Sequence, residues 1–320
     1  MKKLMYLFFI FSVSAFAQTE NYVNILQTFQ EYYNNEDAEV IFETFNKDMK
    51  EAVPLETLNR LVTTFNAQLG KLNRFSFQRK EGATETYLVE FEKANQIMHL
   101  TLDAKGKISG LRFLPAENPD VKPKITRNST PFILPFKGEW FTVWGGDTKA
   151  QNYHVVSGTQ RHAFDFLILG KNNRTYERSG TRNEDYYAFG KPVYAVCDAT
   201  VVQVIEGVED NRPTQMNPAE PTGNTVILKA GENEYIVYAH FEKGTIKVKE
   251  GDVVKQGQFL GSCGNSGNST EPHIHLHVQD GPDLMTAVGV KCYFKSLMVN
   301  GELKTDFSPV RLDKIGRVEE

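Results

Sequence analysis

The sequence predicts two folded domains, a small α+β domain followed by a larger domain that is rich in β-strands. Three observations support this. A length of 320 residues suggests about two domains, and a hydrophobic content of 40% is enough for ordinary cores. The apolar spacing changes from helical to alternating near Phe75. A proline-containing polar stretch from Pro115 to Pro135 then precedes a glycine-punctuated region, which indicates a connection between domains.

The N-terminus has the features of a secretory signal peptide. Lys2 and Lys3 precede an apolar run from Leu4 to Phe11, and Ala15-Phe16-Ala17 is a small-x-small cleavage signal. The apolar run is too short for a membrane span, and no later segment is long and apolar enough. We therefore assign residues 1–17 to a signal peptide. We expect an exported protein of the periplasm, the cell envelope or the medium.

Residues 18–114 are expected to form the α+β domain. Apolar residues at i, i+3, i+4 and i+7 spacing predict one helix after residue 20, and two more are expected at Ile41–Met49 and Pro54–Leu69. Short alternating strands are expected at Thr84–Phe91, Gln96–Leu102 and Lys107–Phe113. This order of elements resembles the cystatin- or NTF2-like modules found ahead of hydrolase domains in secreted bacterial proteins. A binding or spacer role follows, because the segment has no metal or nucleophile motif.

Residues 115–135 are predicted to form an extended linker, and residues 136–320 the second domain. Two long polar loops, residues 171–185 and 206–223, are expected at the rim of a groove. The strand patterns of this domain lie at Ala163–Leu169, Lys191–Val204, Asn224–Leu228 and Tyr235–Tyr238.

Charge and cysteine content argue against two classes of function, nucleic-acid binding and thiol chemistry. The formal net charge of -4 provides no basic surface for nucleic acid. The three cysteines, Cys197, Cys263 and Cys292, are an odd number for an exported protein, so at least one thiol is unpaired or pairs between chains. No protease or C-x-x-C motif surrounds Cys263, which we interpret as a small buried residue.

The stretch from Gly261 to Val278, GSCGNSGNSTEPHIHLHV, carries the chemistry. Its histidines, His273, His275 and His277, occupy every second position, so in an extended strand they project from one face. Three imidazoles are costly to bury without partners. Metal binding or acid–base chemistry explains them, and a weak surface metal patch is the alternative.

Four stretches together resemble the M23 family of zinc metallopeptidases, the lysostaphin- or LytM-like endopeptidases of peptidoglycan. The resemblance covers about residues 136–300 and implies a mainly antiparallel, barrel-sandwich-like β-domain. The stretches are NYHVVSGTQRHAFDF from Asn152, KPVYAVCDATVVQV from Lys191, Tyr238-Ala239-His240, and GDVVKQGQFLGSCGNSGNSTEPHIHLH from Gly251.

The resemblance implies a role for each residue that matches the family's motifs. Asp165 and His275 would be zinc ligands, and His240 and His273 would be catalytic. A catalytic zinc ion takes three protein ligands and keeps one position for water, which it acidifies while polarising the scissile carbonyl. His277 would line the groove or support a ligand.

The first ligand is the point at which the sequence departs from the family. Arg161 occupies its usual position, four residues before Asp165. His162 is three residues before Asp165, so a regular strand would place it on the opposite face unless a bulge intervened. His154 lies further back, in a turn-like run that could fold over the metal. We favour His154 as the third ligand, with His162 as the alternative.

Three functions follow as hypotheses. The leading one is a zinc metallo-endopeptidase that cleaves peptide bonds in bacterial peptidoglycan. The second is a non-catalytic LytM-like envelope protein with a binding or regulatory role. The third is a carrier domain, because GDVVKQGQ from Gly251 also resembles lipoyl and biotinyl hairpins, but the chain lacks the modified-lysine motif of such carriers.

Overall fold

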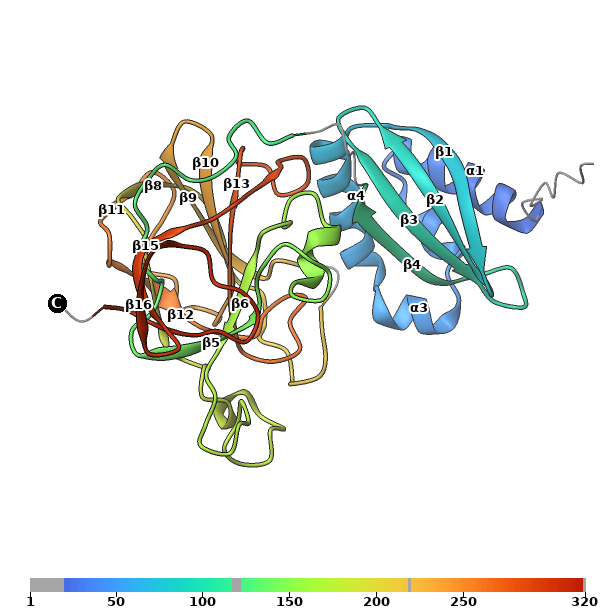
Figure 1. Ribbon diagram of the computed structural model, residues 1–320. Coiled ribbons are helices and arrows are strands. Elements are labelled where there is room, and N and C mark those ends of the chain that lie inside the picture. Colours follow the sequence, from blue (N-terminus) through green and yellow to red (C-terminus); the bar gives the residue numbers. More distant parts are fainter. Residues whose placement is uncertain (1–19, 117–121, 218–219, 319–320) are drawn as a thin grey trace, which may run out of the picture.

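The computed structural model describes residues 20–116, 122–217 and 220–318. The signal peptide expected at residues 1–17 lies outside the described residues. Two bodies are visible: a sheet backed by helices, in blue to green, and a larger β-domain, in green to red (Figure 1).

The first body combines four helices with a four-stranded antiparallel sheet in the order β1-β2-β3-β4. The three expected strands are present, and β1 precedes them. The elements are α1 (Glu20–Asn34), α2 (Ala38–Glu43), α3 (Lys47–Ala52), α4 (Leu55–Leu69), β1 (Leu72–Glu81), β2 (Thr84–Phe91), β3 (Asn95–Leu102) and β4 (Ile108–Pro115).

The helix expected at Ile41–Met49 is wrong, because the chain divides it into α2 and α3. Asn46 has extended backbone angles, and its side-chain oxygen accepts a hydrogen bond from the Met49 amide, which caps α3. Phe45 forms a bridge to Ile108 at the start of β4. The helical periodicity continues through this region, but the cap and the bridge interrupt the helix.

The second body is built on an eleven-stranded sheet. Its order is β11-β8-β9-β10-β13-β6-β5-β17-β15-β16, with β14 paired to β13, and β12 and β7 form a separate pair. Every pairing between these strands is antiparallel, so the expected mainly antiparallel architecture is confirmed. The strands are β5 (Glu139–Trp144), β6 (Phe164–Leu167), β7 (Pro192–Tyr194), β8 (Ala199–Ile205), β9 (Asn224–Gly231), β10 (Glu234–Phe241), β11 (Val253–Val254), β12 (Phe259–Ser262), β13 (Ile274–Gln279), β14 (Gly289–Val290), β15 (Phe294–Val299), β16 (Glu302–Phe307) and β17 (Lys314–Gly316).

The single strand expected at Lys191–Val204 is also corrected. It forms two strands, β7 and β8, which belong to different sheets. Both strands and the turn between them contribute to one apolar core, so the apolar run is continuous although the strand is not.

Each body has its own hydrophobic core, and the predicted linker contributes to the second. Phe132, Leu134 and Phe136 are buried in the core of the β-domain. The buried Glu234 carboxylate accepts hydrogen bonds from the amides of Ser129 and Thr130. The second half of the stretch expected to be a linker is therefore a strap packed on the β-domain.

Replacing Phe132 by alanine tests this strap. Phe132 is fully buried, so we expect Phe132→Ala to lower the free energy of unfolding of the β-domain by about 3–5 kcal/mol. Urea unfolding followed by tryptophan fluorescence reports on this domain, because Trp140 and Trp144 both lie in β5. Thr126→Ala, at an exposed position of the same segment, is the control. Equal stability of the two variants would mean that the strap contributes no core packing.

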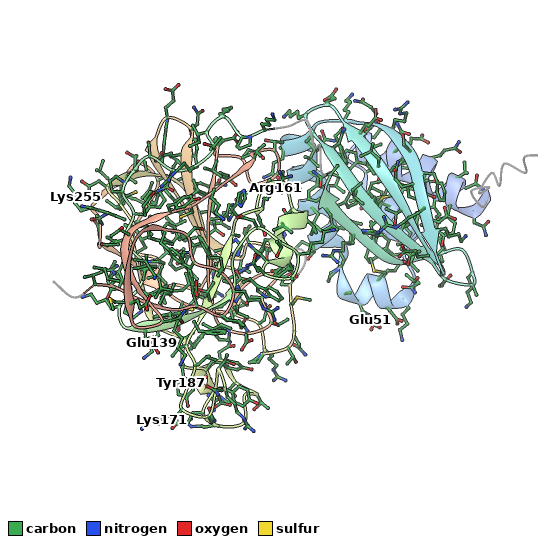
Figure 2. The ribbon with its side chains drawn as sticks, in the orientation of Figure 1. Glu51, Glu139, Arg161, Lys171, Tyr187 and Lys255 are labelled. Carbon is green, nitrogen blue, oxygen red and sulfur yellow. The ribbon has the colours of Figure 1, made fainter. Side chains whose placement is uncertain are left out.

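The two bodies meet at a crevice of about 430 Å³. Residues 91–95 and Ala116 line one side, and Gly158–Thr159, Arg161 and residues 285–288 line the other. Figure 2 shows Arg161 on the side of the β-domain that faces the first body. The Met285 side chain packs against the core of the first body.

No helix among the described residues is long and apolar enough to span a membrane. All three cysteines are free and buried. Burial raises the pKa of the Cys263 thiol well above its ordinary value, as expected for an inert buried residue.

Candidate metal and catalytic site

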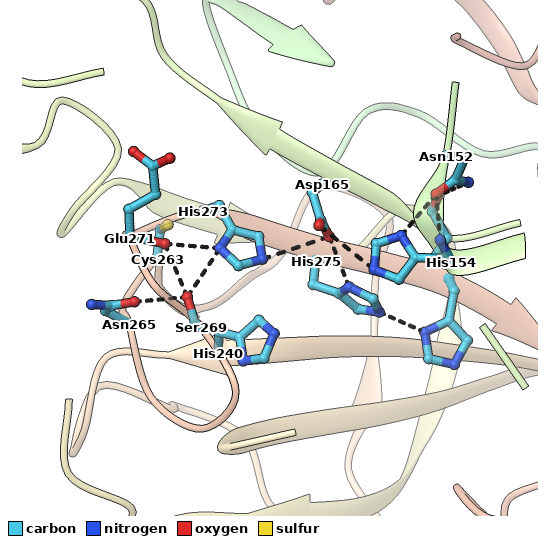
Figure 3. Close-up of polar contacts among 12 residues, drawn as sticks. Asn152, His154, Asp165, His240, Cys263, Asn265, Ser269, Glu271, His273 and His275 are labelled. Atoms are coloured by element: carbon cyan, nitrogen blue, oxygen red, sulfur yellow. Dashed lines mark hydrogen bonds and ion pairs between the residues drawn. The ribbon is translucent and has the colours of Figure 1, made fainter. Parts of the chain in front are cut away.

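The site lies where three neighbouring strands of the large sheet, β10, β13 and β6, run side by side. His275 of β13 is paired with Ala239 of β10 on one side and with Asp165 of β6 on the other. Cross-strand partners project their side chains to the same face. The Nδ1 atom of His275 consequently lies 2.8 Å from Oδ1 of Asp165 (Figure 3).

His154 reaches the same carboxylate from a short 3-10 helix, η1 (Tyr153–Val156). Its Nε2 atom lies 3.6 Å from Oδ2 of Asp165. Its backbone amide and its Nδ1 atom both contact Oδ1 of Asn152, at 3.1 and 2.8 Å. The Asn152 amide group donates to the carbonyls of Gly146 and Ala163, which fixes its orientation. His154 Nδ1 must therefore carry the proton, and Nε2 keeps a lone pair directed at Asp165.

The structure brings His154 to Asp165 and places His162 elsewhere. His162 Nδ1 lies 3.1 Å from Oδ1 of Asp147, a carboxylate that also contacts Lys291. Arg161, at the family's usual ligand position, lines the crevice between the two bodies. Of the two histidines left open by the sequence, His154 has the geometry of a ligand.

His240 reaches the site through an unusual backbone conformation. Alternation along β10 would place its side chain on the same face as Tyr238, in the core. Instead His240 has a φ of 65°, and the pairing with β9 shifts register between Tyr238 and Phe241. The ring is thereby brought to 4.9 Å from that of His273 and 5.7 Å from that of His275, between ring centroids.

Backbone carbonyls fix the protonation pattern of both predicted catalytic histidines. His240 Nδ1 lies 2.7 Å from the Ser266 carbonyl oxygen, and His273 Nδ1 lies 2.8 Å from that of Glu271. A carbonyl only accepts, so each Nδ1 donates, and a neutral His240 ring keeps a lone pair on Nε2. His273 Nε2 lies 3.6 Å from Oδ1 of Asp165, so the carboxylate stabilises a proton on this nitrogen.

His277 contacts the back of His275. His275 Nε2 lies 3.0 Å from His277 Nδ1, and His277 Nε2 lies 3.1 Å from Oε1 of Gln279. The sequence interpretation named His277 but missed Gln279 and Asn152. Gln279 continues the same two-residue alternation, so that pattern could have identified it. Asn152 could have been found as a side chain that caps η1.

Burial and the central carboxylate determine the charge states in the site. Burial opposes ionisation of Asp165, but the surrounding His154 and His273 hold its pKa well below the ordinary value. Burial lowers the pKa of His154 to about 4, although Asp165 opposes this shift. Burial and then His273 and His275 lower the pKa of His240 well below its ordinary value. For His273, Asp165 outweighs burial and raises the pKa.

Two groups of side chains have donor atoms close enough to hold a metal ion, each with all donor atoms within 4.8 Å of one another. One is His154, Asp165 and His275, and the other is His240, His273 and His275. The first includes a carboxylate, which offsets the charge of a cation, and all three residues are buried. Ligand atoms about 2.1 Å from a tetrahedral zinc ion lie about 3.4 Å apart. His154 Nε2 and Asp165 Oδ2 are 3.6 Å apart, and His275 Nδ1 and Asp165 Oδ1 are closer, at 2.8 Å. The carboxylate makes the first group the better candidate for a divalent cation.

Residues 183–286 match the family model "Peptidase family M23". This part of the chain is therefore similar to the M23 peptidases. The match includes His240, His273 and His275, whereas His154 and Asp165 lie before it. Residues 27–111 match a second model, a protein of unknown function named DUF3887.

Curated proteins that are similar to this chain include two from Vibrio cholerae serotype O1. Peptidoglycan DD-endopeptidase ShyC is 33% identical over 152 residues, which cover 43% of this chain and 32% of the relative. Peptidoglycan DD-endopeptidase ShyA is 36% identical over 89 residues, which cover 28% of this chain and 17% of the relative. The matched regions thus span less than a third of the length of either relative.

Solved structures similar to this chain include the catalytic domain of the M23 protein EnpA from Enterococcus faecalis. It is 21% identical with a TM-score of 0.34, and the match covers 50% of this chain and 94% of that one. The catalytic domain of lysostaphin from Staphylococcus simulans is 20% identical with a TM-score of 0.28, covering 48% of this chain and 88% of that one.

Proposed function

We propose that this protein is a zinc-dependent endopeptidase that hydrolyses peptide bonds in bacterial peptidoglycan. One observation carries the proposal. Three buried donor side chains, those of His154, Asp165 and His275, converge beside two further imidazoles whose Nδ1 atoms donate to backbone carbonyls, and the His240 ring keeps its Nε2 lone pair. A site with only a structural role does not require a buried basic nitrogen, such as His240 Nε2, to keep its lone pair available.

The residues present fit a catalytic zinc ion. His154 Nε2, an Asp165 oxygen and His275 Nδ1 would hold it, which is the three-ligand set of catalytic sites. When bound, zinc acts as a Lewis acid that polarises a peptide carbonyl and makes water more acidic.

His240 and His273 would do the proton chemistry. The Ser266 carbonyl orients the His240 ring so that its Nε2 can accept a proton from an attacking water. The Glu271 carbonyl orients His273 in the same way, so that its Nε2 can carry a proton to the leaving amine or donate to the developing oxyanion. Neither ring can rotate without losing its hydrogen bond, and this pre-organises both groups.

The substrate and the location rest on different observations. The curated relatives are named as peptidoglycan DD-endopeptidases, which supports a cell-wall peptide as the substrate. The signal-peptide features of residues 1–17 support export to the compartment that contains this substrate.

Elemental analysis of the purified mature protein tests the proposal. We expect about one zinc ion per chain, together with cleavage of cross-linked wall peptides that is lost on chelation and restored by zinc. Protein without zinc after incubation with the metal, or zinc-loaded protein without peptidase activity, would support the alternative of a non-catalytic envelope protein.

A further inference from the structure

We propose that His277 and Gln279 are positioning residues that hold His275 in the tautomer whose Nδ1 atom binds metal. The inference deepens the proposed zinc site and rests on it. Its basis is a chain of hydrogen bonds that runs from the Asp165 carboxylate through His275 and His277 to Gln279 and ends on the backbone.

The orientation of the Gln279 amide is the first step. Its Nε2 atom lies 2.8 Å from the Gly281 carbonyl oxygen and 3.4 Å from that of Asp283. Both partners can only accept, so the atom between them is the NH2 group. The Gln279 oxygen Oε1 must then face His277.

The tautomer of His277 is the second step. Its Nε2 atom lies 3.1 Å from Gln279 Oε1, which only accepts, so Nε2 carries a proton. The ring is buried, and it contacts no carboxylate within the described part of the chain that would stabilise a second proton. Its Nδ1 atom is therefore an acceptor.

His275 is the third step. Its Nε2 atom lies 3.0 Å from His277 Nδ1, and an acceptor there requires a proton on His275 Nε2. The neutral ring then has a lone pair on Nδ1, only 2.8 Å from an Asp165 oxygen. Two lone pairs at this distance favour a cation shared between them, which the proposed metal ion would supply. Hydrogen-bond partners of this kind typically affect metal affinity by about 10- to 100-fold.

Three variants test whether this chain of hydrogen bonds from Asp165 to Gln279, called the relay below, does more than fill space. His277→Leu removes the acceptor, and Gln279→Leu removes the group that sets the tautomer of His277. His277→Asn is the matched control, because its side-chain oxygen can take the place of Nδ1. Zinc affinity is measured by competition with a chromophoric chelator. We expect about 10- to 100-fold weaker binding for His277→Leu, weaker binding for Gln279→Leu, and affinity within about threefold of wild type for His277→Asn. Wild-type affinity in His277→Leu would overturn the proposal.

NMR of the wild-type protein gives a second measurement that needs neither a variant nor zinc. Long-range nitrogen–proton correlations of 15N-histidine report which ring nitrogen is protonated. The relay requires a proton on His277 Nε2 and none on Nδ1 in the metal-free protein, and the opposite tautomer would refute it. Absence of zinc binding by the wild type would instead refute the proposed function, so the two failures are distinguishable.

Discussion

Replacing His240 by alanine is expected to leave zinc in place and to lower kcat by roughly 10²–10⁴-fold. His240 contributes an imidazole whose Nδ1 is occupied by the Ser266 carbonyl and whose Nε2 lies free beside His273 and His275. The side chain belongs to the proposed proton-transfer machinery and not to the proposed ligand set. Zinc content and kcat, measured on the same preparation, separate these two roles.

The outcome also decides between the two possible metal groups. If His240→Ala lost zinc together with activity, the metal would be held by His240, His273 and His275. His162→Ala is the matched control, because His162 contacts Asp147 and lies outside both groups. We expect that variant to keep both zinc and turnover.

Asp165→Asn is expected to lose zinc and, with it, all measurable turnover. The substitution preserves size but removes the only negative charge of the proposed ligand set, at a fully buried position contacted by three imidazoles. The loss of affinity should exceed the roughly 10- to 100-fold effect of removing a residue that only supports a ligand. Competition with a chelator, followed by a peptidase assay at saturating zinc, measures both effects.

Asp147→Asn provides the comparison for this second variant. Asp147 is also an aspartate in contact with a histidine, but its other partner is Lys291 and it lies at the surface. We expect unchanged zinc affinity there. Equal zinc affinity in Asp165→Asn and wild type would show that Asp165 is not a ligand.

Much of the fold could be predicted because its signals are local. Alternation over Thr84–Phe91 predicts β2 with its observed bounds, since a strand with one buried face repeats every two residues. The division of Ile41–Met49 into two helices could not be predicted from periodicity, because it depends on the Asn46 cap and on contact with Ile108, far along the chain. The strap was missed for a similar reason. Prolines indicate an extended chain but not whether Phe132 and Leu134 have a core to enter.

The candidate site shows the same division. The alternation of His273, His275 and His277 predicts that they lie on one face of the strand. In the structure His273 and His275 contact Asp165, and His277 contacts His275. Asn152 and Gln279, which hydrogen-bond to His154 and His277, were missed because isolated amide side chains are common in any sequence. Their orientation depends on hydrogen bonds to backbone carbonyls, which the sequence alone does not place. His240 is the extreme case, since alternation alone would direct it into the core.

The left-handed backbone at His240 affects which substitutions this position can accept during evolution. That conformation costs an ordinary residue about 1–2 kcal/mol, and glycine or asparagine adopts it more readily. The proposed catalytic role would give selection a reason to keep a histidine at a position where the backbone favours other residues. Once that selection is relaxed, substitution there need not damage the fold, because the side chain faces the site and not the core. The scaffold could therefore lose the proposed activity through one substitution and remain a stable domain, available for binding roles.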